Sequence, residues 1–281
     1  MNPFKIAVIG AGSSYTPEII EELVNRKEQL PVSQVTFMDI DESRLEIMAG
    51  FCRRLLAHIG SPMRIETTTD RRKAIDGAAF VLTQIRVGGN AQRILDEKIP
   101  LKYDVIGQET TGPGGMFKAL RTIPPMLEIA RDVEALNPEA WIINYANPTG
   151  MVAEAVTKYT KVKIAGLCAG GNFPRDFAVN ALGVAPEDVF YDYFGLNHLN
   201  FGYNLRIKGK PLTTEEYDQV LQAATWGSVE PELIAMLGLL PSPYLHYFFH
   251  RERAVREAKA KPLSRGEQVQ QIEGEVFSAY A

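Results

Sequence analysis

The 281-residue sequence has only two cysteines, Cys52 and Cys168, and this scarcity excludes a disulfide-stapled fold. No apolar run approaches the roughly 18 residues that a membrane span needs, so we expect no membrane association. A basic excess is also missing, because 30 Lys and Arg stand against 34 Asp and Glu, and we expect no nucleic-acid partner. The N-terminus lacks a cationic, apolar leader, which predicts a cytoplasmic location.

Short apolar, β-branched runs alternate with stretches of helical period through the first two thirds of the chain. We expect strands at residues 4–10, 34–40, 63–68, 80–85, 141–146 and 162–168, and helices at 17–28, 42–58, 117–136 and 148–159. Strands that are apolar on both faces and alternate with helices indicate a parallel sheet covered on both sides. The predicted fold class is therefore α/β, with a Rossmann-like doubly wound parallel sheet.

The pattern changes from about residue 188, where the chain becomes richer in Tyr, Phe and Asn. A strand, tight turn and strand are expected across residues 204–212, followed by helices at 215–224, 232–237 and 245–258. We predict two domains, a dinucleotide-binding domain at 1–192 and a smaller α+β region at 193–281. Residues 264–281 have helical spacing and no stop signal, which predicts that this second region is C-terminally incomplete.

A glycine-rich turn follows the first expected strand, where residues 10–17 read GAGSSYTP. Gly10 permits a tight turn, and Gly12 lets the backbone approach a pyrophosphate at the start of a helix, with Ser13 and Ser14 beside it. Tyr15 stands where the usual fingerprint has its third glycine. The motif predicts a dinucleotide site.

Asp39 lies at the end of the second expected strand, 27 residues after Gly12. A carboxylate there can accept hydrogen bonds from a ribose hydroxyl and would repel a 2′-phosphate, so NAD is favoured over NADP. The alternative is that Asp39 only caps the next helix.

Further motifs make the sequence recognisable, at residues 10–17, 86–89 (RVGG), 96–103 (DEKIPLKY), 106–115 (IGQETTGPGG), 144–148 (NYANP) and 195–198 (GLNH). Together they resemble glycoside hydrolase family four, the NAD- and manganese-dependent glycosidases, and most closely its 6-phospho-β-glucosidases. The similarity extends over essentially the whole chain.

The resemblance implies a redox-assisted elimination, a known exception to two-carboxylate glycoside hydrolysis. In this family NAD removes hydride from C3 of the sugar, and a divalent metal polarises the resulting ketone. A tyrosine base takes the C2 proton, the C1 leaving group departs, water adds and the hydride returns. The expected substrate is a phosphorylated β-glucoside, and the expected product is glucose 6-phosphate.

By matching motifs, Cys168 and His198 would ligate the metal, Mn²⁺ or another divalent cation, with sugar oxygens completing the site. Without the resemblance, Cys168 is more simply a buried apolar residue and His198 a turn residue. We expect the nicotinamide and this metal to face the same sugar.

The resemblance also assigns residues to the phosphorylated sugar. Arg93 and Asn147 match positions that hold it, Arg86 is a further pocket candidate, and Glu109 matches a carboxylate that raises the basicity of the tyrosine. Read alone, Arg93 would be a solvated helix charge, Asn147 a turn residue and Glu109 a surface carboxylate in a glycine-rich loop.

Two departures from the family pattern leave the activity open. Ala169 follows the metal cysteine where the family has Asn or Asp, and Asn172 is one candidate to replace that side chain. The resemblance places the tyrosine base beyond residue 281, and Tyr280 is not assigned to it. Loss of such a base costs ~10²–10⁴-fold in rate, so a degenerate or truncated member is expected as an alternative.

Two other functions therefore remain open, a non-catalytic NAD and sugar-phosphate binder and an NAD-dependent hydroxy-acid dehydrogenase. The sequence does not distinguish α from β linkage or glucose from galactose, and it does not identify the aglycone. By resemblance we expect a homo-oligomer, a dimer or a tetramer, and residues 244–249 could serve an interface or a core.

Overall fold

The structure is a computed structural model that describes residues 3–224 and 229–281. The chain forms two compact units that do not follow chain order. The first comprises Met1–Pro100, Gly107–Leu167 and Leu263–Ala281, and the second comprises Leu101–Ile106 and Cys168–Pro262. The predicted division after residue 192 falls inside a strand of the second unit.

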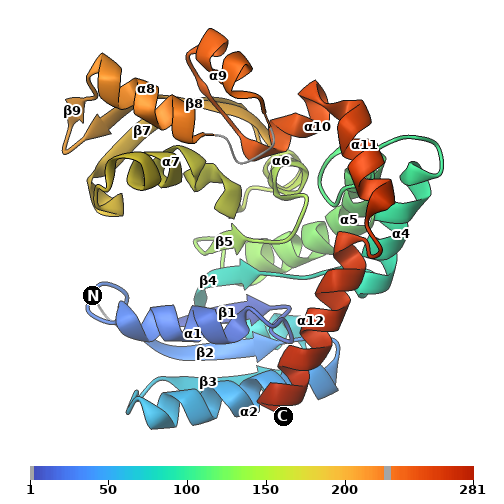
Figure 1. Cartoon of the computed structure of the whole chain (residues 1–281). Coiled ribbons are helices and arrows are strands. Elements are labelled where there is room, and N and C mark those ends of the chain that lie inside the picture. Colours follow the sequence, from blue (N-terminus) through green and yellow to red (C-terminus); the bar gives the residue numbers. More distant parts are fainter. Residues whose placement is uncertain (1–2, 225–228) are drawn as a thin grey trace. The chain divides into compact units, whose positions relative to one another are not determined.

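Six parallel strands form the sheet of the first unit, and each of them coincides with an expected strand to within a few residues (Figure 1). Their order is β3-β2-β1-β4-β5-β6, the order of a doubly wound dinucleotide-binding sheet. The strands are β1 (Phe4–Ile9), β2 (Val32–Met38), β3 (Arg64–Thr68), β4 (Ala78–Thr83), β5 (Trp141–Asn144) and β6 (Lys163–Gly166).

Helices cover both faces of this sheet. On one face α1 (Thr16–Asn25) and α2 (Glu42–His58) bury an apolar layer that includes Phe37, which has no exposed surface. On the other face α3 (Arg71–Ile75), α5 (Gly112–Leu136) and α6 (Thr149–Tyr159) enclose a second layer. Burial of each large apolar side chain contributes about 1.5–3 kcal/mol, and the two layers confirm the predicted doubly wound fold.

Two further helices complete the first unit. They are α4 (Gly89–Leu101), which follows β4, and α12 (Arg265–Tyr280), which packs on α2. Ser264 begins α12 with a capping box, because its hydroxyl accepts from the Glu267 N–H and Glu267 accepts from the Ser264 N–H. The expected helix at residues 264–281 is therefore confirmed.

The second unit is built on a small antiparallel sheet of β7 (Val189–Leu196), β8 (Leu199–Ile207), β9 (Lys210–Pro211) and β10 (Leu240–Pro241). Its helices are α7 (Phe173–Leu182), α8 (Thr214–Ala223), α9 (Pro231–Leu237), α10 (His246–Phe249) and α11 (Arg251–Ala260), with short 3₁₀ turns η1 (Ala169–Asn172), η2 (Pro186–Asp188) and η3 (Pro243–Leu245). Phe173 and Phe177 of α7 pack with Leu205 of β8 in its core.

The single helix expected at residues 245–258 is wrong. The chain forms η3, α10 and α11 there, and the break falls at His250, whose φ of −124° and ψ of 42° are not helical. The aromatic run from Tyr244 masked this break, because apolar periodicity continued through it. Among the described residues, no helix is long and apolar enough to cross a membrane.

Candidate active site

The glycine turn between β1 and α1 has the conformation that its sequence predicts. Gly10 has a φ of +91°, and a Cβ there would lie 3.0 Å from the Gln84 and Ile85 backbone. The Gly10 N–H donates to the Met38 carbonyl at 2.8 Å, and the Ser13 N–H donates to the Gly10 carbonyl at 3.1 Å. The turn therefore requires glycine and delivers Ser13, together with the half-buried Ser14, to the start of α1.

Asp39 contacts this turn directly. Its Oδ2 accepts the Gly12 N–H at 2.8 Å, and a Cβ on Gly12 would meet the same oxygen at 2.8 Å. Asp39 does not cap α2, since Asp41 does so by accepting the Arg44 N–H at 3.0 Å. A carboxylate can accept about four hydrogen bonds, so Asp39 keeps acceptor capacity for a ribose hydroxyl. The glycine turn at the start of α1 and this acid fit a dinucleotide.

Glu109 lies at the centre of a buried cluster of charges. Its carboxylate pairs with Arg86 and Arg93, two residues that were expected at the site from the sequence. It also pairs with Lys118 of α5, which was not expected there. Arg86 Nη1 lies 2.7 Å from Glu109 Oε1, Arg93 Nη1 lies 3.3 Å from Oε2, and the Lys118 ammonium bonds Oε1. Glu109 is therefore not a surface carboxylate.

The cluster shifts the pKa of both of its central groups. Burial alone would raise the pKa of Glu109, but the charges of Lys118, Arg86 and Arg93 outweigh it and hold the pKa at about 2. Burial, together with the two arginines, lowers the pKa of Lys118 to about 8 although Glu109 favours its charged form. Glu109 is thus ionised across the physiological range.

Glycines position Glu109 by letting its loop pack closely. A Cβ on Gly107 would lie 1.7 Å from the Glu97 carbonyl oxygen, one on Gly114 2.5 Å from the Gln108 oxygen, and one on Gly115 2.5 Å from the Thr110 carbonyl carbon. Each contact is with backbone, which cannot move aside as a flexible side chain can. The glycine-rich segment folds tightly over α4 and points Glu109 at the arginines.

Arg93 is nine-tenths buried on α4 and is shared between two carboxylates. Its Nε donates to Glu97 at 2.9 Å, in addition to its ion pair with Glu109. Glu97 in turn accepts the Gly266 N–H of α12 at 2.7 Å. Arg93 is not a solvated helix charge. A guanidinium has five N–H donors, so this one retains donors for a phosphate.

Asn147 is half-buried in the loop after β5 and precedes a cis peptide bond to Pro148. Its neighbour Asn144 holds that loop. The fully buried Asn144 amide oxygen accepts from Thr83 at 2.9 Å and from the Ala146 N–H at 3.1 Å, while its nitrogen donates to Ala146 and Thr149. Asn147 is thus carried on a rigid turn.

Cys168 and His198 meet in the second unit, with Cys168 Sγ 3.4 Å from His198 Nε2. Cys168 immediately precedes η1, and His198 lies in the two-residue turn between β7 and β8. His198 is 7% exposed and has a φ of +64°, which is uncommon for a residue with a side chain. A buried imidazole held in a strained turn against a thiol is typical of a functional site.

Tyr244 lies against this pair. Its ring stacks on the His198 imidazole with centroids 3.6 Å apart and an interplanar angle of 4°. Gly170 makes room for it, because a Cβ there would lie 3.2 Å from the Tyr244 ring and 3.5 Å from Cys168 Sγ. No sequence signal marks Tyr244 as a site residue, since neither its Ser-Pro-Tyr setting nor its aromatic neighbours distinguish it from a core residue.

The donor set fits a divalent cation that takes part of its coordination from outside the protein. Thiolate and imidazole are both transition-metal ligands. Within residues 3–224 and 229–281, no three His, Cys, Asp or Glu side chains form a cluster that could hold a metal. A cation between Cys168 and His198 would therefore need sugar oxygens or water as further ligands.

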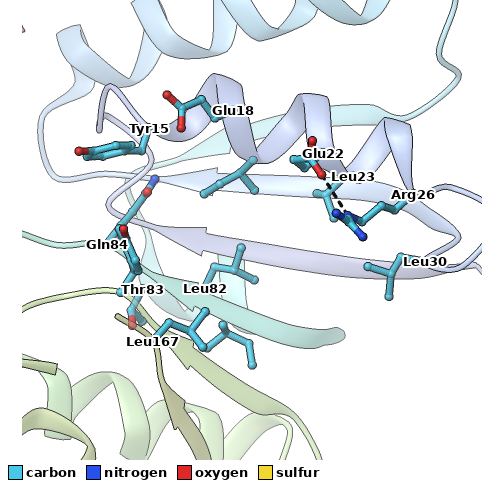
Figure 2. A pocket seen from close by; sticks show the side chains of 13 residues that line it. Tyr15, Glu18, Glu22, Leu23, Arg26, Leu30, Leu82, Thr83, Gln84 and Leu167 are labelled. Atoms are coloured by element: carbon cyan, nitrogen blue, oxygen red, sulfur yellow. Dashed lines mark hydrogen bonds and ion pairs between the residues drawn. The ribbon is translucent and has the colours of Figure 1, made fainter. Parts of the chain in front are cut away.

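A separate apolar cavity of about 420 Å³ runs along α1. Figure 2 shows Leu23 and Leu82 lining it, with the Glu22–Arg26 ion pair at its side and Tyr15 and Gln84 at one end. None of the predicted site residues lines this cavity.

Comparisons with known proteins identify the family of this chain. Two family models match, Family 4 glycosyl hydrolase over residues 5–175 and its C-terminal domain over residues 193–281. The chain is 41% identical to a probable 6-phospho-beta-glucosidase of Bacillus subtilis and 40% identical to a 6-phospho-beta-glucosidase of Escherichia coli. Each alignment covers 98% of this chain, which spans 66% and 65% of the two relatives.

A solved structure is similar throughout. The 6-phospho-beta glucosidase of Thermotoga maritima, determined with manganese, NAD+ and glucose-6-phosphate, superposes with a TM-score of 0.90 at 34% identity. The superposition covers 99% of this chain and 66% of that one. Fold, motifs and family models lead to one conclusion: the chain belongs to family 4 of the glycosyl hydrolases.

Proposed function

We propose that this chain hydrolyses 6-phospho-β-glucosides to glucose 6-phosphate with NAD and a divalent metal, Mn²⁺ by preference. The observation that carries the proposal is the packing of Cys168, His198 and Tyr244, which joins two metal-ligand types to a phenol. The names of the relatives and the ligands of the Thermotoga maritima structure support the same substrate class.

The glycine turn and Asp39 would hold the dinucleotide. The backbone of the glycine turn and the N-terminus of α1 would hold the pyrophosphate, and the Asp39 carboxylate would accept a hydrogen bond from a ribose hydroxyl. When bound, NAD accepts and returns a hydride, and the cation polarises the oxygen of the oxidised sugar carbon. The chain's own residues provide binding, orientation and proton transfer.

Tyr244 is the group we assign to the C2 proton. It lies on the imidazole that would ligate the cation, so its hydroxyl belongs to the same part of the second unit as the metal pair. Tyr280 does not have this role in the proposal, because its ring stacks on Phe51 in the first unit. With Tyr244 assigned, the chain contains a tyrosine base of its own.

The charged cluster would serve the sugar phosphate. Arg93 and Arg86 offer guanidinium donors in low-dielectric surroundings, where a phosphate gains most from paired, charge-assisted bonds. Asn147 supplies an amide on its rigid loop. Glu109 is assigned as the carboxylate that raises the basicity of the tyrosine, because a nearby negative charge disfavours the phenolate.

An assay with a chromogenic 6-phospho-β-glucoside tests the proposal. Glucose 6-phosphate release should require both NAD and Mn²⁺, and the unphosphorylated β-glucoside should not be turned over. Release that is unaffected by removal of NAD would contradict the proposed mechanism. Net NADH accumulation with a hydroxy acid would instead support a dehydrogenase.

Ala169 favours a second candidate, a non-catalytic binder of NAD and sugar phosphate. A methyl group next to the metal cysteine can neither donate a proton nor bind a sugar hydroxyl. Tight NAD binding without turnover would support this function. Homo-oligomer formation and a cytoplasmic location remain predictions from the sequence.

A further inference from the structure

Arg44, in the first turn of α2, is held by three separate contacts. Its Nε donates to the Gly12 carbonyl at 3.1 Å. Its Nη2 lies 3.6 Å from Glu273 Oε2, and its Cζ lies 4.1 Å from the centre of the Phe277 ring. Glu273 and Phe277 both belong to α12, more than 200 residues further along the chain.

Arg44 also lies beside the acid expected to bind the ribose. A Cβ on Gly12 would meet Asp39 Oδ2 at 2.8 Å and Arg44 Cβ at 3.0 Å, so the two side chains flank the same glycine. In dinucleotide sites an acid at this place selects NAD, whereas a nearby arginine accommodates the 2′-phosphate of NADP. The first unit contains both groups.

The contacts that α12 makes with Arg44 determine whether Asp39 or Arg44 sets the dinucleotide preference. Glu273 is itself anchored, because it accepts from Asn90 Nδ2 at 2.8 Å. The N-terminal end of α12 is tied to α4 through the Gly266 N–H and Glu97, and Tyr280 stacks on Phe51 of α2 at its other end. Glu273 and Phe277 therefore occupy fixed positions. The Glu273 carboxylate offsets the charge of Arg44, and the Phe277 ring covers its guanidinium.

We propose that α12 sets the dinucleotide preference of this chain by retaining Arg44 on Gly12, Glu273 and Phe277 and so withholding it from a 2′-phosphate. The inference deepens the proposed function and rests on it. It adds a specificity-determining segment that is remote from the dinucleotide turn in the sequence.

The test compares NAD+ and NADP+ binding by titration calorimetry on the full chain. The Glu273→Gln/Phe277→Ala variant releases Arg44, and we expect its NADP+ affinity to rise about tenfold, the effect of one hydrogen bond to a charged group, with NAD+ affinity changed less. The single Glu273→Gln variant should shift in the same direction, and it remains informative if the double variant does not fold. Gln270→Ala, an exposed position on α12, is the matched control.

A third variant, Arg44→Ala in the double-variant background, identifies the group responsible. Loss of the NADP+ gain there supports the inference. An unchanged NADP+ affinity in the released variants, or a gain that persists without Arg44, overturns it. Failure of the wild-type chain to bind either dinucleotide would refute the proposed function instead, so the two failures are distinguishable.

Discussion

The Tyr244 ring lies flat on the imidazole of His198, at a centroid separation of 3.6 Å and an interplanar angle of 4°. Cys168 Sγ lies 3.4 Å from His198 Nε2, so the phenol, the imidazole and the thiol form one cluster. The assigned metal ligands and proton acceptor are therefore adjacent within one compact unit.

Removal of the Tyr244 hydroxyl should stop proton abstraction without unfolding the protein. Tyr244→Phe keeps the stacked ring, so we expect turnover to fall by ~10²–10⁴-fold while thermal stability changes little. The Tyr217→Phe variant removes a phenol of the same unit that bonds the Gly238 carbonyl, and it is the control. Wild-type turnover in Tyr244→Phe would exclude Tyr244 as the base.

Metal removal should abolish turnover reversibly. Because the described residues supply a pair of ligands and no larger cluster, we expect weak Mn²⁺ binding that strengthens when glucose 6-phosphate is present. Electron paramagnetic resonance of free Mn²⁺ measures both affinities. Cys168→Ser should weaken binding, whereas the exposed His58→Asn should not. Equal Mn²⁺ affinity in Cys168→Ser would argue against this site.

Lys118 should make the activity sensitive to alkaline pH. The folded protein loses the Lys118 proton near pH 8, whereas an unfolded lysine loses it near pH 10.5. The unfolded chain binds more protons in that window, so this group makes stability rise with pH there. Over the same window Glu109 loses a buried cation, and turnover should fall.

Variants of Lys118 test this pH dependence. Lys118→Arg stays charged, so its pH–rate profile should extend to higher pH, while Lys118→Met should be impaired at all pH values. Lys98→Met, which removes a half-exposed lysine paired with Glu267, is the control. Identical alkaline limbs for the wild type and Lys118→Arg would contradict the assignment.

A methyl group on Gly12 should block dinucleotide binding. The Cβ of Gly12→Ala would lie 2.8 Å from Asp39 Oδ2, so either the turn or the acid must shift. We expect NAD affinity to fall at least about tenfold, the loss of one charge-assisted hydrogen bond. Titration calorimetry measures this affinity. The control is Gly274→Ala, because a Cβ on Gly274 would meet no neighbour. Gly60→Ala is unsuitable as a control, because Gly60 has a φ of +66° and alanine there would be strained. Unchanged affinity would refute the assigned turn.

Local sequence signals predicted much of this architecture. Apolar strands, the glycine turn and Asp39 act through contacts between neighbouring elements, and the structure has the strands and the turn where they were expected. Lys118 and Tyr244 were missed for a common reason. Lys118 lies in an otherwise amphipathic helix and meets Glu109, nine residues earlier, only because the glycine-rich loop folds back on that helix. Tyr244 lies in an aromatic run and meets His198 only through packing between segments that are far apart in the sequence. Burial and pairing of that kind leave no periodic pattern in the sequence from which they could be predicted.

The origin of the hydrogen at C2 of the product tests the mechanism most directly. When the reaction runs in deuterium oxide with NAD and Mn²⁺, proton removal by Tyr244 and its return from solvent should leave deuterium at C2 of the released glucose 6-phosphate. Proton magnetic resonance of the product detects the label. Glucose 6-phosphate released at the same rate with ordinary hydrogen at C2 would contradict the account.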